Sequence, residues 1–129
     1  MRRILEPGEK PLFWVSASKQ DLIAMPEPVV RQIGEALGVA QYGGKHPDAK
    51  PWTGLGSGVF EVVNYFNKDA YRAAYVVRFE KAIYVLHCLQ KKSLSGSRTA
   101  KTDMDLIERR LKAAKIDYEV RYGKAKQTR

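Results

Sequence analysis

Three β-type segments follow one another closely in the middle of the chain, and this succession constrains the fold more than any other feature. The segments are "VFEVVNYF" (59–66), "YRAAYVVRF" (71–79) and "AIYVLHCL" (82–89), all rich in branched and aromatic residues. Connections this short suit antiparallel neighbours, because parallel strands need a crossover of a dozen or more residues. The sequence predicts an antiparallel meander. Its last strand is apolar on both faces and is expected to be central or covered on both sides.

The connections between these segments carry their own signals. "NKDA" (67–70) has turn chemistry. Glu80 and Lys81 have the spacing of a two-residue hairpin but are not a favoured pair, so a longer loop is equally compatible. The Gly/Pro-rich segment 41–58 predicts a long irregular loop, which is either functional or a surface loop anchored by Trp52.

Helical patterns flank the meander. After a short β-type run at 10–15, the segment 16–40 predicts a short helix, a break at Pro26 and Pro28, and a second helix with an apolar stripe. Candidate boundary residues are Ser16 and Ser18 at the start of the first helix and Gly38 at the end of the second. The segment 99–115 predicts another helix, whose candidate N-caps are Thr99 and Thr102. The expected architecture is α+β, with N-terminal helices packed on a small antiparallel sheet and a C-terminal helix.

Size and composition bound the remaining possibilities. The chain has 129 residues, and we expect one domain over residues 1–129 with a basic tail from about 121. Cys88 is the only cysteine and lies in an apolar run, where an inert buried thiol is expected. With two histidines and one cysteine, no standard structural zinc set is present, and we expect neither a metal nor a cofactor.

The charge favours a polyanionic partner. A net charge of +9 on a domain of this size indicates nucleic acid or an acidic protein, although a basic surface that serves only solubility remains open. The sequence shows no signal-peptide pattern and no apolar stretch near the roughly 20 residues that span a bilayer. We therefore expect a cytoplasmic protein that does not enter membranes.

Cations gather on and after the strands. Arg72 and Arg78 share one face of the third strand-like segment, and Lys91 and Lys92 follow the last one. A guanidinium fork matches two phosphate oxygens, so this surface is suited to an RNA backbone. The arginines could instead lie on a solvated sheet face, and the lysines could protect a hydrophobic strand from aggregation. Further residues expected to contact RNA are Arg78, Arg98 and Lys101.

Metal-free RNA cleavage is the reaction that these residues could support. RNA carries its own nucleophile, the 2′-hydroxyl, so the protein must align it, stabilise phosphorane charge and move protons. His87, a lysine of lowered pKa or a tyrosine could exchange the proton, although His87 could equally be a hydrogen-bonded core residue. "GLGSG" (54–58) precedes a strand rather than a helix, so it does not match a dinucleotide fingerprint.

An ordered set of motifs resembles the RelE/ParE superfamily, specifically the HigB-like, phage-derived branch of type II toxins. The motifs are a "VFE" strand, "YRAAYVV", "YVLHCLQKKS", and a "T-x-K-x-D" helix start followed by "ERRLK". The resemblance implies a RelE-like fold and a metal-independent mRNA interferase acting on the translating ribosome. It also implies a helix-turn-helix antitoxin as partner.

The resemblance also implies roles for individual residues. Arg72 matches the arginine that contacts the scissile phosphate, and Lys91 and Lys92 match the basic pair after the last strand. Together with His87 they form the predicted catalytic set. Arg98 falls near the position of a catalytic tyrosine in some relatives.

This chain departs from some relatives on the strand before "YR", where Glu61 and Val63 replace lysines, and no tyrosine lies between Lys92 and Arg110. Two alternatives therefore stay open: a ParE-like inhibitor of DNA gyrase, and a non-catalytic basic phage-type protein that only binds RNA or a partner.

Overall fold

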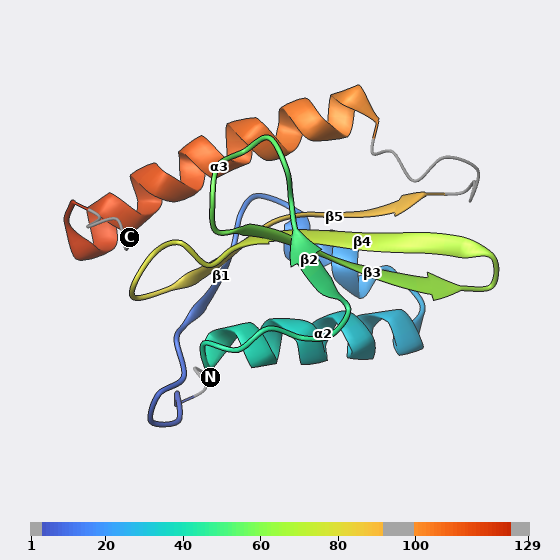
Figure 1. Cartoon of the computed structure of the whole chain (residues 1–129), viewed down its shortest axis with the longest axis horizontal. Coiled ribbons are helices and arrows are strands. Elements are labelled where there is room, and N and C mark those ends of the chain that lie inside the picture. The colour runs from blue at the N-terminus through green and yellow to red at the C-terminus, as the bar shows by residue number, and fades with distance from the viewer. Residues whose placement is uncertain (1–3, 92–99, 125–129) are drawn as a thin grey trace.

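A computed structural model describes residues 4–91 and 100–124 of the chain, with the side chain of Lys91 excepted. The strands are β1 (Leu12–Trp14), β2 (Ala49–Pro51), β3 (Val59–Phe66), β4 (Asp69–Val76) and β5 (Ile83–Lys91). The helices are α1 (Ser18–Ile23), α2 (Glu27–Gln41) and α3 (Lys101–Tyr122). This is the α+β architecture that the sequence predicts, with two N-terminal helices, a sheet and a C-terminal helix (Figure 1).

The described strands form one five-stranded sheet in the order β1-β5-β4-β3-β2. The meander β3-β4-β5 is antiparallel, as predicted, and β2 also pairs antiparallel with β3. The expectation of a purely antiparallel sheet is wrong, because β1 pairs with β5 in parallel. A parallel pair requires a long connection, and α1, α2, β2, β3 and β4 all lie between β1 and β5 in the chain. The short strand β2 falls within the segment expected to be irregular.

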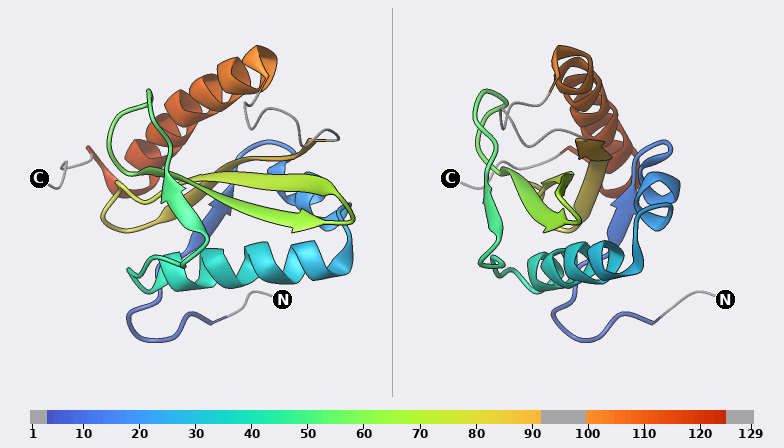
Figure 2. Two further views of the ribbon diagram at one scale, coloured as in Figure 1. Left: turned by 45° about the vertical axis from the view of Figure 1, so that its right-hand side comes forward. Right: turned by 90° about the vertical axis from the view of Figure 1, so that its right-hand side faces the viewer.

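Helices cover both faces of the sheet (Figures 1 and 2). On one face α1 and α2 pack on a core that includes Ile33, Leu37 and Tyr75. On the other face α3 packs on a second core that includes Tyr84 and Ile107. The strand β5 lies between β1 and β4 and contacts α1 and α3, so the prediction that this strand is central or covered on both sides is confirmed by its two covered faces.

The turn between β3 and β4 is tighter than the four residues predicted. Asn67 and Lys68 both have positive φ, 49° and 68°, which is the pattern of a two-residue type I′ hairpin. Asp69 therefore belongs to β4 and pairs with Phe66. This detail fixes the register of the two strands and, with it, which side chains meet on the sheet.

The helix boundaries depart from prediction at the caps. The break at Pro26 is confirmed, but α1 begins after Ala17 and no side chain caps it. The Ser18 hydroxyl is buried and donates to the Val85 carbonyl at 3.2 Å, so it joins α1 to β5 instead of capping. Gly38 does not end α2, because the buried Ala40 keeps the last turn packed on the sheet despite the cost of an internal glycine.

The C-terminal helix is longer than the predicted 99–115. Its N-cap is Ala100, so Thr102 is not the cap, and Thr99 lies outside the described residues. The helix continues to Tyr122 because Tyr118 is buried and its ring stacks on that of Phe79, with centroids 4.7 Å apart. The start of the predicted tail at about 121 is therefore helical. Among the described residues, no helix combines the length and apolar character needed to cross a membrane.

Candidate active site

The register of the meander aligns three residues across the sheet. Glu61 of β3 pairs with Ala74 of β4, and Ala74 pairs with His87 of β5. Two strand spacings separate the Cα atoms of Glu61 and His87 by about 10 Å. Arg72 lies two positions from Ala74 along β4, so all these side chains share the face that α3 covers.

Arg72 and Glu61 form an ion pair on this face. The Arg72 Nη1 atom lies 2.7 Å from the Glu61 Oε1 atom, and the two side chains are only 5% and 13% exposed. The alternative that Arg72 lies on a solvated sheet face is therefore wrong. A buried pair with close hydrogen-bond geometry loses several kcal/mol when one partner is removed, because the other charge is left uncompensated.

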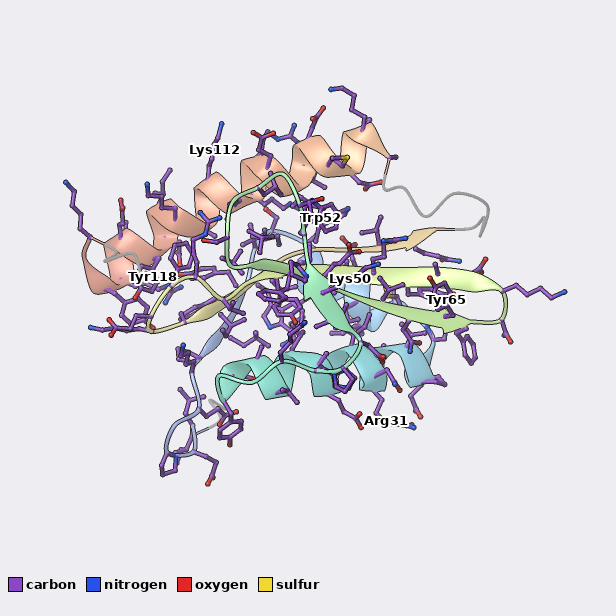
Figure 3. All side chains as sticks on the ribbon, in the orientation of Figure 1. Arg31, Lys50, Trp52, Tyr65, Lys112 and Tyr118 are labelled. Atoms are coloured by element: carbon purple, nitrogen blue, oxygen red, sulfur yellow. The ribbon has the colours of Figure 1, made fainter. Side chains whose placement is uncertain are left out.

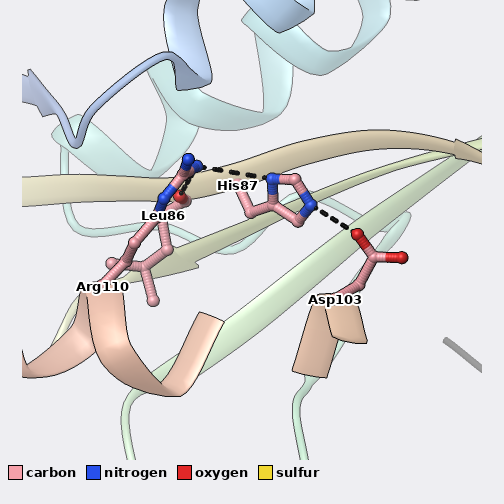
Figure 4. A network of polar contacts seen from close by, with 4 residues as sticks. All are labelled: Leu86, His87, Asp103 and Arg110. Atoms are coloured by element: carbon pink, nitrogen blue, oxygen red, sulfur yellow. Dashed lines mark hydrogen bonds and ion pairs between the residues drawn. The ribbon is translucent and has the colours of Figure 1, made fainter. Parts of the chain in front are cut away.

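His87 is held by two side chains from α3 (Figure 4). Its Nε2 atom lies 2.8 Å from the Asp103 Oδ1 atom. Its Nδ1 atom lies 3.4 Å from Nη1 of Arg110, which also donates to the Leu86 carbonyl at 2.9 Å. Because a guanidinium can only donate, Nδ1 is the acceptor, and Nε2 carries the hydrogen directed to Asp103.

The sequence of α3 explains this arrangement. Asp103 and Arg110 are seven residues apart, which is close to two helical turns, so they lie on the same side of the helix. The buried Ile107 lies between them and packs on the sheet. Asp103 is in the first turn of α3, where the helix dipole favours a carboxylate. The helix thereby delivers one acidic and one basic group to His87.

Arg78 has a different position from the one expected. It lies beyond β4, and its Nε and Nη2 atoms donate to the carbonyls of Ser57 and Leu55 at 3.0 and 2.7 Å. The loop wraps closely around it: a Cβ on Gly58 would lie 2.5 Å from the Arg78 Cβ. Arg78 therefore holds the segment between β2 and β3 in place.

That loop lies beside α3, as Figure 2 shows. A cavity of about 130 Å³ separates the two, lined by Trp52, Thr53, Gly54, Leu55, Met104, Asp105 and Glu108. The predicted anchoring role of Trp52 is confirmed, because this residue is buried in the core beneath α3. The loop thus borders the same side of the sheet as the Glu61–Arg72 pair.

The remaining predicted cations are only partly described. The backbone of Lys91 pairs with Ala70 at the end of β5. Lys92 and Arg98 lie outside the described residues. Lys101 begins α3, is fully open to solvent and pairs with Asp105 one turn later at 3.1 Å. The structure therefore brings Arg72 and His87 to one face, while Arg78 bonds to the loop and Lys101 points into solvent.

Sequence reasoning missed the three residues that contact the predicted ones. The sequence marks Glu61 only as a departure from relatives, and it gives Asp103 no role in the site. Arg110 was not considered. The spacing of Asp103 and Arg110 on one helical face was an available signal, but their common target, His87, depends on how α3 lies on β5.

A family model and a solved structure are similar to this chain. The family model described as "Phage derived protein Gp49-like (DUF891)" matches residues 20–112, from α1 to the middle of α3. No curated protein matches the chain. A solved structure, the toxin-antitoxin complex RelBE2 from Mycobacterium tuberculosis, aligns with 15% identity and a TM-score of 0.40, covering 68% of this chain and 98% of that chain. A likeness of that degree supports no assignment of residues.

Proposed function

The chain belongs to the phage-derived Gp49-like family, the branch of RelE/HigB-type toxins that its motifs resemble, and on that premise we propose that it is an mRNA interferase. It cleaves RNA without a metal, on the translating ribosome in the cytoplasm, and a helix-turn-helix antitoxin holds it in check. The observation that carries the proposal is the Glu61–Arg72 ion pair on the same sheet face as His87.

The reaction needs only groups of this kind. The 2′-oxygen of RNA attacks the adjacent phosphorus, and its proton passes to a base. The bond from phosphorus to the 5′-oxygen breaks, and that oxygen receives a proton from an acid. The products are a 2′,3′-cyclic phosphate and a 5′-hydroxyl. A cation near the phosphate stabilises the charge that develops on the phosphorane oxygens.

Three residues fit the three roles. Arg72 takes the phosphate, because its guanidinium can donate to two oxygens. Glu61 is the base, since its carboxylate already lies 2.7 Å from Arg72 and would meet the 2′-hydroxyl of a bound nucleotide. His87 is the acid, on the opposite side of Ala74. To serve as the acid, it must exchange Asp103 for the leaving oxygen at Nε2 and take up a second proton at Nδ1 in place of the contact with Arg110, because only the imidazolium form is an effective acid.

The other predicted cations bind the substrate. Lys91, the last residue of β5, and Lys92, the next in the chain, supply charge for the phosphate, and Arg98 and Lys101 contact the RNA backbone. Arg78 acts indirectly, since its guanidinium donates to the Leu55 and Ser57 carbonyls and so positions the loop beside α3. The excess of positive charge over the chain supports a polyanionic substrate.

Induced expression in a bacterial host tests the proposal. We expect growth arrest with loss of full-length mRNA, and relief of both when a helix-turn-helix protein encoded next to this gene is expressed together with it. Arrest with intact mRNA and inhibited supercoiling would instead indicate a gyrase inhibitor. The absence of arrest would leave the non-catalytic binding protein as the better account.

A further inference from the structure

A second cavity lies on the opposite face of the sheet, where α2 ends. It has a volume of about 230 Å³ and is lined by Lys10, Ala40, Gly43, Gly44, Lys45, Phe60, Tyr75 and Val77. Tyr75 belongs to the core under α2, whereas Ala74, its neighbour on β4, belongs to the core under α3. The cavity is therefore separate from the proposed active site and does not depend on that proposal.

The side-chain donors around this cavity make no hydrogen bond and no ion pair with the residues that the structure describes. Tyr75 is 1% exposed, and within the described part of the chain its hydroxyl makes no hydrogen bond. The ammonium groups of Lys10 and Lys45 form no ion pair with any described carboxylate, and Lys45 lies over the Phe60 ring at 6.0 Å. The hydroxyl oxygen of Tyr75 is not fully enclosed by protein atoms, so it is open to the cavity and can donate to a molecule bound there.

The lining is also rigidly held. The Lys10 amide donates to the Gln41 carbonyl and the Gln41 side-chain amide donates to the Lys10 carbonyl, both at 2.8 Å. These two bonds fix Lys10 against the end of α2. The Gly44 amide donates to the Val39 carbonyl at 3.0 Å and fixes the turn after the helix. A site whose walls are already in place loses little entropy on binding.

Volume and chemistry define the occupant. A cavity of about 150 Å³ takes up benzene in an engineered protein, so this one has room for a single ring with a small charged group. Phe60 and Val77 supply an apolar wall. None of the lining residues is acidic, and the available donors are two ammonium groups and one phenol.

We propose that this cavity binds a small organic anion, a carboxylate or a phosphate carried on one ring. The Lys10 and Lys45 ammonium groups contact the anion. The Tyr75 hydroxyl donates to it the hydrogen bond that it does not make in the protein alone. Burial raises the pKa of Tyr75 to about 12, so the phenol keeps its proton and remains a donor to an anion at neutral pH.

Titration followed by NMR, with ¹⁵N-labelled full-length protein, tests this binding. The probes are benzoate, phenyl phosphate and the neutral benzamide. We expect saturable shifts of the Gly43 and Gly44 amides, with one of the anions binding at least about tenfold more tightly than benzamide, as one charge-assisted contact provides. The tighter anion identifies the head group. Equal affinity for benzoate, phenyl phosphate and benzamide, or no saturable shifts, would overturn the proposal.

Variants make the test specific. Lys45→Met keeps the approximate length of the side chain. It should weaken binding of the anion about tenfold without changing the affinity for benzamide. Tyr75→Phe removes only the hydroxyl and should weaken binding of the anion about threefold. Lys112→Met is the matched control, because Lys112 extends into solvent from the outer side of α3 (Figure 3). If Lys45→Met and Lys112→Met had the same effect, general charge would explain the binding and the site would be refuted.

Discussion

The Glu61 carboxylate of β3 and the Arg72 guanidinium of β4 lie 2.7 Å apart. Both side chains are largely buried and lie on the sheet face that α3 covers. This contact gives Arg72 two roles at once. It neutralises a buried carboxylate in the folded protein, and it is the proposed phosphate ligand. Loss of activity on removing Arg72 is therefore ambiguous, and the variants must separate the two roles.

A paired substitution separates them. Arg72→Ala alone should destabilise the protein by about 3–5 kcal/mol, because Glu61 is left buried and uncompensated. Arg72→Leu combined with Glu61→Leu removes both charges together and should leave the free energy of unfolding within about 1 kcal/mol of the parent, or above it. Urea denaturation measures both values. Equal destabilisation by the single and double variants would contradict the buried-pair account.

The role of His87 can be separated from that of its partner. If His87 is the acid, His87→Gln should lower the cleavage rate at least about 100-fold. Asp103→Asn keeps an oxygen that accepts from Nε2 and should lower the rate less than about tenfold. Cleavage rates measured at matched unfolding free energies check this. Parallel losses in the two variants would show that His87 serves only to join β5 to α3.

The loop between β2 and β3 offers a stability test. Gly58→Ala would place a Cβ 2.5 Å from the Arg78 Cβ and 2.9 Å from its Cα, at a φ of +81°. Gly54→Ala is the control, since its φ is +98° but nothing lies within 4 Å. Backbone strain costs about 1–3 kcal/mol in both, and only Gly58→Ala adds the clash. Chemical denaturation should therefore give Gly58→Ala a clearly lower free energy of unfolding than Gly54→Ala. Equal free energies would argue against close packing of the loop on Arg78.

Buried groups with raised pKa values make stability depend on alkaline pH, and Cys88 and Tyr75 are two of them. Burial raises the pKa of the Cys88 thiol from 9.0 to about 12 and that of Tyr75 from 10.0 to about 12. The folded state keeps these protons while the unfolded chain releases them. The stabilisation is therefore complete below about pH 9 and is lost as the pH rises toward about 12, by up to about 1.4 kcal/mol per pH unit for each group.

The variant Cys88→Ala tests whether the thiol contributes to this pH dependence of stability. With the thiol removed, the fall in unfolding free energy between about pH 9.5 and 11.5 should become shallower by about 1.4 kcal/mol per pH unit. Urea denaturation at several alkaline pH values gives both slopes. An unchanged slope would mean that Cys88 ionises as readily in the folded protein as in the unfolded chain.

The meander, the helices and the covering of β5 on both faces could be predicted because they depend on local periodicity and composition. The Glu61–Arg72 contact could not, because it depends on one turn. A four-residue turn at 67–70 would place Phe66 opposite Tyr71, and in that register Glu61 would face Val76. The observed two-residue turn places Glu61 opposite Ala74.

The partners of His87 were beyond prediction for a related reason. Asp103 and Arg110 share one side of α3 by helical periodicity alone. Which strand that side covers depends on the packing of α3 over the sheet, and Ile107, Ala114 and Tyr118 set that packing. Long-range packing thus decides the site, while local sequence decides the elements that carry it.

The most direct test of the central claim is the chemistry of RNA ends in cells that express the protein. Sequencing that captures 2′,3′-cyclic phosphates and 5′-hydroxyls should reveal new ends within coding sequences for the parent. It should reveal none for the folded Glu61→Leu, Arg72→Leu variant. Growth arrest without such ends, or the same ends with that variant, would contradict RNA cleavage at the Glu61–Arg72 site.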